Sequence, residues 1–395
     1  MTPVFWWPLL AVLFIAGLFF RVYMVSVAAV MLAVVSALAQ WQQRHALDQV
    51  SYRRRPYYRR AFPGEKVPLR LEVENRKLLP VAWLRVEDPW PYVVGPEDEA
   101  ALVQTHLADE GLLVSLFSLR WFERSVRHYT LIFRRRGYYL VGPARLTSGD
   151  LFGLFEETQT QPKREALTVF PELLPFERLR LPTDDPFGDR QARRRLFEDP
   201  NLPMGVRDYL PDDDFRRVHW PATARQGELQ VKVYQPVTAR VLAVCLNVST
   251  FHYYWEGVDP VLLEHMVSVA ATLIANAIED GFRVGLISNG TLAHADQPFR
   301  VPPGRSPQQL SQLLAALAGV TPFVSTPFER LLLRETPRLP FGARLFIVTG
   351  VVTDELAEML LRLKRHGRPI TVLSFALTAP PAIPGIRSVH LPFKR

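Results

Sequence analysis

Cysteine is nearly absent from this 395-residue chain, which contains only Cys245. A single cysteine cannot form a disulfide within the chain, and its place inside an apolar run predicts a small buried residue in a reducing compartment. Charge is missing from the amino-terminal end, where residues 1–20 and 22–43 have no charged side chain and are separated by Arg21. Each run approaches the ~20 residues that a helix needs to cross a bilayer. The chain therefore begins with two candidate membrane spans.

Short motifs that carry common enzyme chemistry are missing as well. The chain has no G-x-x-x-x-G-K-[ST] loop, no G-x-G-x-x-G, no G-x-S-x-G, no H-E-x-x-H and no cysteine pair for zinc. The net charge is +8, but zinc-finger spacing, an aromatic RNA-binding motif and a separate basic tail are all absent. We expect no nucleic-acid partner, no catalytic residues and no enzymatic activity. Anionic lipid headgroups account for much of the positive charge.

Residues 1–43 are predicted to form a transmembrane helical hairpin. One continuous helix over both runs would be about 60 Å long, roughly twice the bilayer core. The basic juxtamembrane segment that follows, residues 44–61, contains six arginines and should remain in the cytoplasm. The alternative is a signal peptide cleaved after residues 37–39, although its usual positive n-region is missing. We expect an inner (plasma) membrane protein with two spans and cytoplasmic soluble domains.

Alternating apolar and polar residues predict a β-sandwich over residues 62–170. In residues 67–74, VPLRLEVE, every second side chain is apolar, as in a half-buried strand. Further strands are predicted at 81–87, 112–119, 126–133 and 138–146. No helical period competes with these strands. Residues 171–200 are charged and contain prolines, which predicts a linker with the arginine run 193–195 exposed to solvent.

The pattern changes to α/β in residues 201–395. Apolar strands are predicted at 241–248, 283–288, 344–349 and 370–375, with helices between them. Asp259 before Pro260 predicts a capped helix start, and Ser306 and Gln309 have the spacing of a capping box. Alternating strands and helices predict a mostly parallel sheet covered by helices on both faces. Ligands of such sheets bind beyond the carboxyl ends of the strands, so we expect a site there.

The segment GVRDYLPDDDFRRVHWPATARQGEL, residues 205–229, groups three aspartates with arginines and a histidine. Carboxylates accept backbone N–H groups in tight turns and bind arginine through two bonds. The aspartates 212–214 are therefore predicted to hold a network of turns and ion pairs, and Trp220 to pack this loop against the sheet. If Asp213 and Arg225 form a buried pair, loss of either partner destabilises the domain.

A longer motif runs through residues 205–234. Its members occur in the order Arg207, Asp208, Tyr209, Pro211, Asp213, Arg216, His219, Trp220, Ala224 and Arg225. Upstream elements are Arg136-Gly137-Tyr138, Gly142-Pro143 and Asp150-x-Phe152-Gly153-Leu154-Phe155. Together they resemble the domain of unknown function 58 family, membrane-anchored prokaryotic proteins, over nearly the whole chain. The resemblance implies a structural or partner-binding role for Arg207, Asp208, Tyr209, Asp213, Asp214, Arg216, His219, Trp220 and Arg225.

Two predicted strands end in NVSTF, residues 247–251, and VTG, residues 348–350. These ends resemble the von Willebrand factor A fold, in which an Asp-x-Ser-x-Ser loop and a later aspartate help to coordinate a divalent ion. Asn247 stands in the place of the first aspartate, and Phe251 in that of the second serine. Hard cations need oxygen ligands that usually include a carboxylate. We therefore expect a degenerate metal loop, without metal or cofactor, at Asn247, Ser249 and Thr349.

The expected function is that of a membrane-anchored, non-enzymatic scaffold or adaptor. The family resemblance implies that it works with a MoxR-type AAA+ ATPase and a transglutaminase-like membrane protein in assembly or maturation of envelope complexes. Two alternatives remain open. One is a metal-dependent protein-binding module of the von Willebrand A type, with Ser249 and Thr349 as residual ligands. The other is a hydrolase that uses Asp213, Asp214 and His219.

Overall fold

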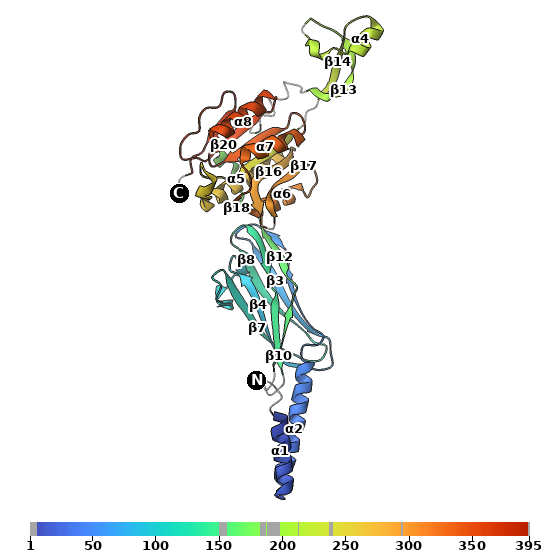
Figure 1. The fold of residues 1–395 in the computed structure, drawn as a ribbon, viewed down its shortest axis with the longest axis vertical. Helices are drawn as coiled ribbons and strands as arrows, with labels where there is room; N and C mark the ends of the chain where they lie inside the picture. Colours follow the sequence, from blue (N-terminus) through green and yellow to red (C-terminus); the bar gives the residue numbers. More distant parts are fainter. Residues whose placement is uncertain are drawn as a thin grey trace. The chain divides into compact units, whose positions relative to one another are not determined.

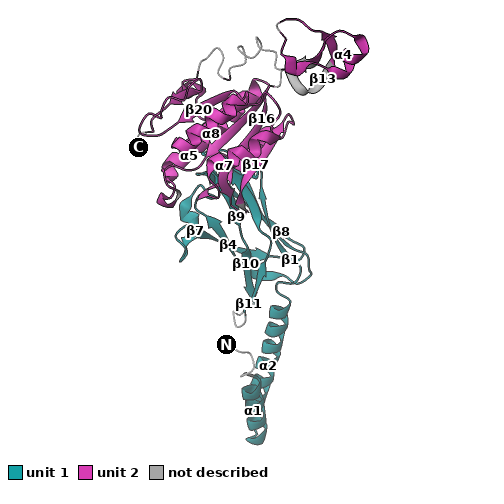
Figure 2. Ribbon diagram, turned by 45° about the horizontal axis from the view of Figure 1, so that its top comes forward, with its two compact units in different colours: residues 1–169 teal, residues 170–395 magenta. Residues whose placement is uncertain are grey.

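The computed structural model describes residues 6–149, 156–181, 187, 198–211, 213–236, 240–293 and 295–393. The chain divides into two compact units, Met1–Val169 and Phe170–Arg395, which Figure 2 shows in different colours. Unit 1 contains apolar helices and β-sheets, and unit 2 contains a mixed sheet with helices. The predicted motif at Asp150–Phe155, the arginine run 193–195 and Asp212 lie outside the described residues.

Unit 1 begins with two apolar helices, α1 (Trp6–Phe19) and α2 (Tyr23–Arg44), which lie side by side (Figure 1). They approach closely at Gly17, where an added Cβ would lie 2.5 Å from the Ser26 hydroxyl. α2 is long and apolar enough to cross a bilayer, whereas α1 has only 14 residues. In unit 2, α5 (Pro260–Glu279) has a similarly apolar composition but is mostly buried.

Most strands of unit 1 belong to two antiparallel sheets, with the orders β1-β3-β8-β5 and β11-β10-β4-β7-β6, and a smaller sheet has the order β2-β12-β9. The bounds are β1 (Val50–Pro56), β2 (Arg60–Ala61), β3 (Lys66–Asn75), β4 (Val81–Pro91), β5 (Val94–Pro96), β6 (Leu102–Gln104), β7 (Glu110–Leu119), β8 (Arg124–Phe133), β9 (Gly137–Val141), β10 (Ala144–Gly149), β11 (Glu156–Gln161) and β12 (Glu165–Val169). Their buried alternate residues form one core, which includes Leu69, Leu71, Leu84, Leu131 and Leu146.

The strands predicted at 67–74, 81–87, 112–119 and 126–133 are present as β3, β4, β7 and β8. The single strand predicted at 138–146 is wrong, because this stretch forms β9 and β10 in different sheets. Gly142 has φ of +98° and is followed by Pro143, which lacks an N–H, so the strand pairing is interrupted there. β1 comes from residues that were expected to form a basic segment ahead of the sandwich.

A buried ion pair connects β1 with β4. The Asp88 carboxylate accepts bonds from Arg54 Nε at 2.8 Å and Nη2 at 2.6 Å, from the Tyr52 hydroxyl at 2.6 Å and from Trp90 Nε1 at 3.0 Å. The Arg54 guanidinium lies against Gly142, where an added Cβ would come within 2.7 Å of Nη2. Burial raises the pKa of Tyr52 well above its ordinary value, so its hydroxyl donates to Asp88. The cluster joins the two main sheets.

Replacement of Asp88 by alanine should destabilise unit 1 by about 3–5 kcal/mol, because it leaves the Arg54 charge buried without a partner. Denaturant unfolding of the full-length protein in detergent, followed by hydrogen exchange in β1 and β4, measures this loss. Lys66→Met is the matched control, because Lys66 and Glu97 form an exposed pair that should contribute less than about 1 kcal/mol. Equal effects of the two substitutions would contradict the role of Asp88.

The sheet of unit 2 has the order β17-β16-β15-β19-β20-β21, and β18 also pairs with β16. β16, β15, β19, β20 and β21 run parallel, while β17 and β18 are antiparallel to β16. The strands are β15 (Val241–Asn247), β16 (Arg283–Leu292), β17 (Ala295–Gly304), β18 (Val320–Val324), β19 (Arg344–Thr349), β20 (Ile370–Ser374) and β21 (Arg387–His390). In the described residues after β15, the α-helices besides α5 are α6 (Gln309–Ala318), α7 (Phe328–Glu335) and α8 (Asp354–Arg365).

All residues of β15 and β19 are buried, as expected for strands covered on both faces. Cys245 lies in the core that α7 and α8 share with the sheet, and burial raises the pKa of its thiol to about 12. Asp259 caps α5 as predicted, by accepting bonds from the backbone N–H groups of Val261 and Leu262. The capping box predicted for α6 is wrong, because the Gln309 side chain is buried and donates to carbonyl groups of β16 and β17.

Part of the expected linker packs against this unit. Phe187 is buried, with its ring centroid 5.3 Å from that of Phe282 and 5.6 Å from that of Phe346. Leu179, in the short helix η3 (Phe176–Leu179), is also buried. The described part of residues 171–200 therefore contributes apolar side chains to the core of unit 2.

The family motif lies mainly on a hairpin made of β13 (Glu198–Asp208) and β14 (Gln230–Pro236), labelled in Figure 1. Between these strands the chain forms η4 (Phe215–Arg217) and α4 (Trp220–Gln226). α4 ends at Gly227, which has φ of +76°, a left-handed conformation that glycine adopts without strain.

Candidate functional site

A cleft of about 520 Å³ lies at the carboxyl ends of β15 and β19. Three loops line it: residues 247–253 after β15, residues 324–329 before and within α7, and residues 351–356 at the start of α8. Because β15 and β19 are parallel neighbours, their carboxyl ends meet at one edge of the sheet. The structure therefore places an open cavity where the sequence predicted a site.

A network of uncharged polar groups forms the floor of the cleft, which Asn247 and Ser249 line, and continues beneath it. The Asn247 amide donates to the Thr349 hydroxyl at 3.0 Å, and its oxygen accepts from the Ser249 N–H at 3.1 Å and from Asn289 Nδ2 at 3.0 Å. Asn289 in turn accepts from the Val248 N–H at 2.9 Å. These bonds tie the end of β15 to β16 and to the end of β19. Asn247 and Thr349 are brought together as the sequence predicted.

These residues do not fit a divalent cation. A hard cation prefers several oxygen ligands, usually with a carboxylate to offset its charge. The Asn247 oxygen is neutral and already accepts two N–H groups, and the Thr349 hydroxyl donates to the Val351 carbonyl at 2.6 Å. Among the residues that the structure describes, no group of three or more His, Cys, Asp or Glu side chains is close enough to hold a metal.

Aromatic and acidic side chains surround this floor. Phe251, Tyr253 and Phe328 line the cleft, and the Tyr253 ring stacks on Trp255 with centroids 4.5 Å apart. Two carboxylates, Glu329 and Glu355, lie in the same lining. Hydrogen bonds from the backbone at the start of α8 and from the Thr353 hydroxyl lower the pKa of Glu355, so it is ionised at neutral pH. The cleft therefore combines apolar rings with negative charge.

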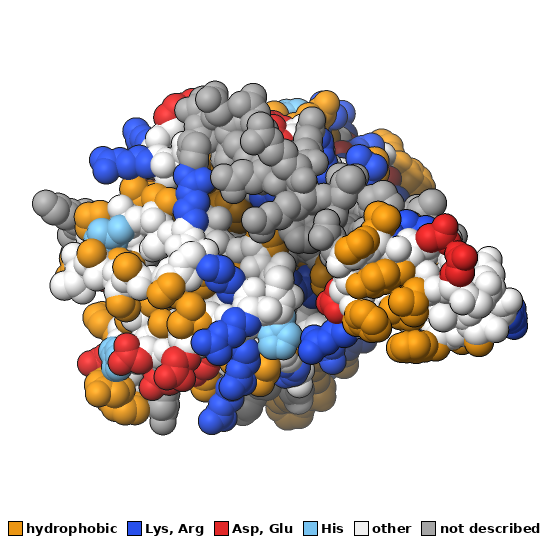
Figure 3. Space-filling model, turned by 90° about the horizontal axis from the view of Figure 1, so that it is seen from above, with side chains coloured by type: hydrophobic (Ala, Val, Ile, Leu, Met, Phe, Trp, Pro, Cys, Tyr) orange, Lys and Arg blue, Asp and Glu red, His pale blue; other side chains and the backbone are white. Residues whose placement is uncertain are grey.

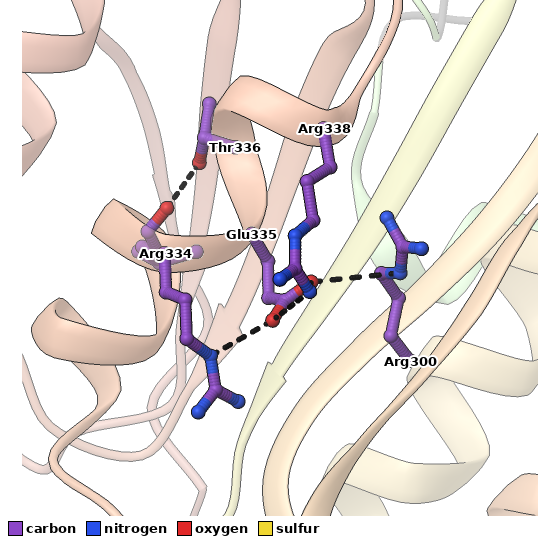
Figure 4. Close-up of polar contacts among 6 residues, drawn as sticks. Arg300, Arg334, Glu335, Thr336 and Arg338 are labelled. Carbon is purple, nitrogen blue, oxygen red and sulfur yellow. Dashed lines mark hydrogen bonds and ion pairs between the residues drawn. The ribbon is translucent and has the colours of Figure 1, made fainter.

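A second polar cluster fixes the opposite end of α7, whose first residues line the cleft. Figure 4 shows three guanidinium groups, from β17, α7 and the short helix η6 (Thr336–Arg338), around the carboxylate of Glu335. Arg334 lies at 2.9 Å, Arg338 at 3.1 Å and Arg300 at 3.5 Å from this buried carboxylate. Since Arg300 belongs to β17, the cluster fastens α7 to the edge of the sheet.

In the hairpin, Asp213 forms an ion pair with Arg207 and not with Arg225. Both Arg207 terminal nitrogens lie 2.6 Å from Asp213 oxygens, and the Leu210 N–H donates to the same carboxylate at 2.9 Å. The Arg207 bonds, with this backbone bond, lower the pKa of Asp213. Arg225 lies exposed on α4. The pair expected between Asp213 and Arg225 is therefore wrong, because Arg207 on β13 lies closer.

The remaining motif residues hold turns. Asp214 caps η4 by accepting from the Arg216 N–H at 3.0 Å, and His219 Nδ1 accepts from the Ala222 N–H at 3.0 Å at the start of α4. Asp208 accepts from the Gln230 amide at 2.6 Å across the hairpin. Among the described residues, no hydrogen bond links His219 to Asp213 or Asp214. The geometry brings these residues into one hairpin but not into a catalytic pair.

The expected packing of Trp220 against the sheet is wrong. Its side chain is 62% exposed on α4, a helix of seven residues. Val206, Leu210 and Phe215 are exposed as well, while the Phe215 ring lies 5.5 Å from that of Tyr209. In Figure 3, hydrophobic side chains gather on the hairpin lobe.

Sequence reasoning missed several residues of the cleft and of the network beneath it. Asn289 follows the strand predicted at 283–288, so its position after a buried strand was the available signal. Ser325, whose N–H and hydroxyl both donate to the Asn289 carbonyl, comes from a loop without such a signal. Tyr253 also lies in a loop, and Glu329 lies in the first turn of α7.

Comparisons with known proteins agree with the resemblance of the hairpin segment. Residues 205–380 match the profile of a family described as "Protein of unknown function DUF58". The chain is similar to the uncharacterized protein YeaD of Bacillus subtilis (strain 168), with 22% identity over 301 residues, 75% of this chain and 69% of YeaD. The family match includes the hairpin and most of the unit 2 sheet.

Two solved structures that the chain is similar to align with parts of it. A CARDB domain from Pyrococcus furiosus is 11% identical and aligns with 30% of this chain and 91% of its own, with a TM-score of 0.20. The sporulation control protein Spo0M from Bacillus subtilis is 14% identical and aligns with 41% of this chain and 58% of its own, also with a TM-score of 0.20. Scores this low carry no argument about fold or function.

The substitution Asn247→Asp should destabilise the carboxyl edge of the sheet by about 1–3 kcal/mol, because the carboxylate cannot donate to Thr349 and Asn247 is only 4% exposed. Hydrogen exchange in β15 and β19 measures the loss. The wild-type protein should show the same exchange with Mg²⁺ as with a chelator. Slower hydrogen exchange in wild-type β15 with Mg²⁺ than with the chelator would contradict the conclusion that these residues do not fit a cation.

Arg207→Ala should raise the pKa of Asp213 toward its ordinary value, since the main cause of its lowering is removed. Arg225→Ala is the control and should leave this pKa unchanged. Because the folded-state pKa is depressed, the stabilisation is present above pH ~3.9 and is lost as the pH falls through the folded-state value. Carboxyl NMR titration tests this, and a shift with Arg225→Ala alone would refute the assigned pair.

Proposed function

We propose that the protein is a membrane-anchored, non-enzymatic scaffold whose unit 2 binds a segment of a partner protein in the cleft after β15 and β19. The observation that carries the proposal is the cleft itself. It is open and rimmed by aromatic rings, and the polar groups of its floor already bond to one another. Aromatic rims with few charged groups are typical of binding sites.

The membrane anchor in this proposal is the pair α1 and α2. Large apolar side chains along both helices are exposed in unit 1, including Val12, Ile15, Phe19, Met24 and Met31. An uninterrupted exposed apolar surface of this kind requires lipid or protein cover. The arginines after α2 favour a cytoplasmic location for the soluble parts at the inner membrane.

Unit 2 is, in this proposal, a domain of the von Willebrand A type in which a hydrogen-bonded network has replaced the metal. Asn247 occupies the position of the first aspartate and bonds to Thr349, which removes the need for a cation to hold the two strands. Glu329 and Glu355 give the cleft negative charge, which suits basic side chains of a partner. The family resemblance suggests a MoxR-type AAA+ ATPase as that partner, with a transglutaminase-like membrane protein in the same assembly.

The test is affinity capture of the full-length protein from gently solubilised native membranes. The wild type should recover a MoxR-type AAA+ ATPase. The double variant Tyr253→Ser/Glu329→Gln should recover several-fold less, because it removes one ring and one charge from the cleft.

Tyr57→Ser is the matched control, because Tyr57 is an exposed tyrosine of unit 1 and should not affect recovery. Equal recovery with the wild type and the cleft variant would place docking elsewhere. Failure of the wild type to recover any ATPase would refute the proposed partner class.

A further inference from the structure

Two turns of the sandwich lie beside the end of α2. β1 begins opposite the end of β3, and β4 begins opposite the end of β7. The β3–β4 turn at 76–80 and the β7–β8 turn at 120–123 therefore lie at the same end of the sandwich as residues 45–49, which join α2 to β1. The strand register alone fixes this placement.

Hydrogen bonds hold these segments together. The Lys77 ammonium donates to the Ala46 carbonyl and, at 2.9 Å, to that of Asp48. The Phe122 N–H donates to the Lys77 carbonyl at 3.3 Å. Asn75 is fully buried and donates to the Arg120 carbonyl at 2.9 Å. Both turns are therefore positioned by the chain segment that leaves the helix.

The tips of the two turns carry large apolar side chains that face solvent. Leu78 is 77% exposed, Trp121 62% and Phe122 64%. Phe122 also has φ of +51°, a left-handed conformation that bulky side chains rarely adopt. Such strain persists only where surrounding structure enforces it, and it is concentrated at functional sites. Exposed basic residues, Arg120 and Arg124, flank the rings.

The height of the turns along α2 matches the surface of a bilayer. From Tyr23 to Trp41, α2 rises about 27 Å, close to the ~30 Å hydrocarbon core. Trp41 is exposed near this boundary, where tryptophan is enriched. Ala46 follows within about 8 Å, which is inside the headgroup layer. Lys77 contacts Ala46, so the turns lie at headgroup depth.

We propose that Leu78, Trp121 and Phe122 form a second membrane contact, in which the tip of the sandwich enters the headgroup region of the bilayer that the helices cross. The inference rests on the proposed membrane anchor and extends it. Aromatic rings favour this region because it accommodates an apolar body with a polar edge. The neighbouring arginines fit anionic headgroups. Two attachments, helix and tip, would fix the tilt of the sandwich on the membrane.

The test is a set of single-cysteine labels on the full-length protein. Cys245 can remain, because it is fully buried and its thiol pKa of about 12 makes it unreactive. An environment-sensitive fluorophore is attached at Leu78→Cys or Phe122→Cys. Tyr58→Cys is the control at the opposite end of the sandwich, and Val30→Cys on α2 reports the anchor. The protein is reconstituted in phosphatidylcholine and phosphatidylglycerol vesicles that contain a lipid with a nitroxide quencher, placed near the headgroup for positions 58, 78 and 122 and midway along the acyl chain for position 30.

We expect a blue-shifted emission and several-fold stronger quenching at positions 78 and 122 than at position 58. The added substitution Trp121→Ser should reduce quenching of the Phe122→Cys label. If position 30 is quenched but 78 and 122 are not, the second contact is refuted and the anchor stands. If position 30 is not quenched, both proposals fail. Equal quenching at position 58 would also refute the inference, because the contact would not belong to the tip.

Discussion

Asp88 is the residue on which the architecture of unit 1 depends. Its carboxylate is buried in the core. Tyr52, Arg54 and Trp90 donate four hydrogen bonds to it, so no water is needed to satisfy its oxygens. Tyr52 and Arg54 lie on β1, the strand that follows α2, and Asp88 lies on β4 in the other main sheet. The Arg54–Asp88 pair therefore ties the strand next to α2 to that sheet. A slip of β1 by one residue would turn Arg54 outward and leave Asp88 buried alone, so the charge also fixes the strand register.

Unit 2 also buries polar side chains that need hydrogen-bond partners, but these side chains are uncharged. Polar residues at the ends of β15 and β19 and within β16 meet at one edge of the sheet, where neutral amides and hydroxyls satisfy one another. The two solutions differ in consequence. A buried ion pair is intolerant of losing a partner, whereas a neutral network leaves the edge accessible to ligands of either charge, with specificity set by the rim. This difference suits a structural role for the first cluster and the binding role proposed for the second.

Much of the fold could be predicted from local pattern, because strands such as 67–74 alternate and 241–246 is uniformly apolar. β1 was missed because its inward positions include Arg54, whose burial depends on a carboxylate 34 residues away. The same limit applies to the site. Asn289 and Thr349 lie 42 and 102 residues after Asn247, and only the strand order brings the three side chains together. For Asp213 several arginines were near in sequence, and the hairpin register selected Arg207.

The burial of α5 has a consequence for synthesis of the chain. This helix is as apolar in composition as a membrane span. Of the strands that it packs on, β15 precedes it along the chain, but β16 and β19 follow it. If the proposed anchor attaches the nascent chain to the membrane, α5 is exposed to lipid before β16 and β19 are translated. Glu264 and Glu279 within the helix oppose insertion, because carboxylates are costly in hydrocarbon. These two residues would keep the nascent helix available for folding instead of letting it enter the membrane.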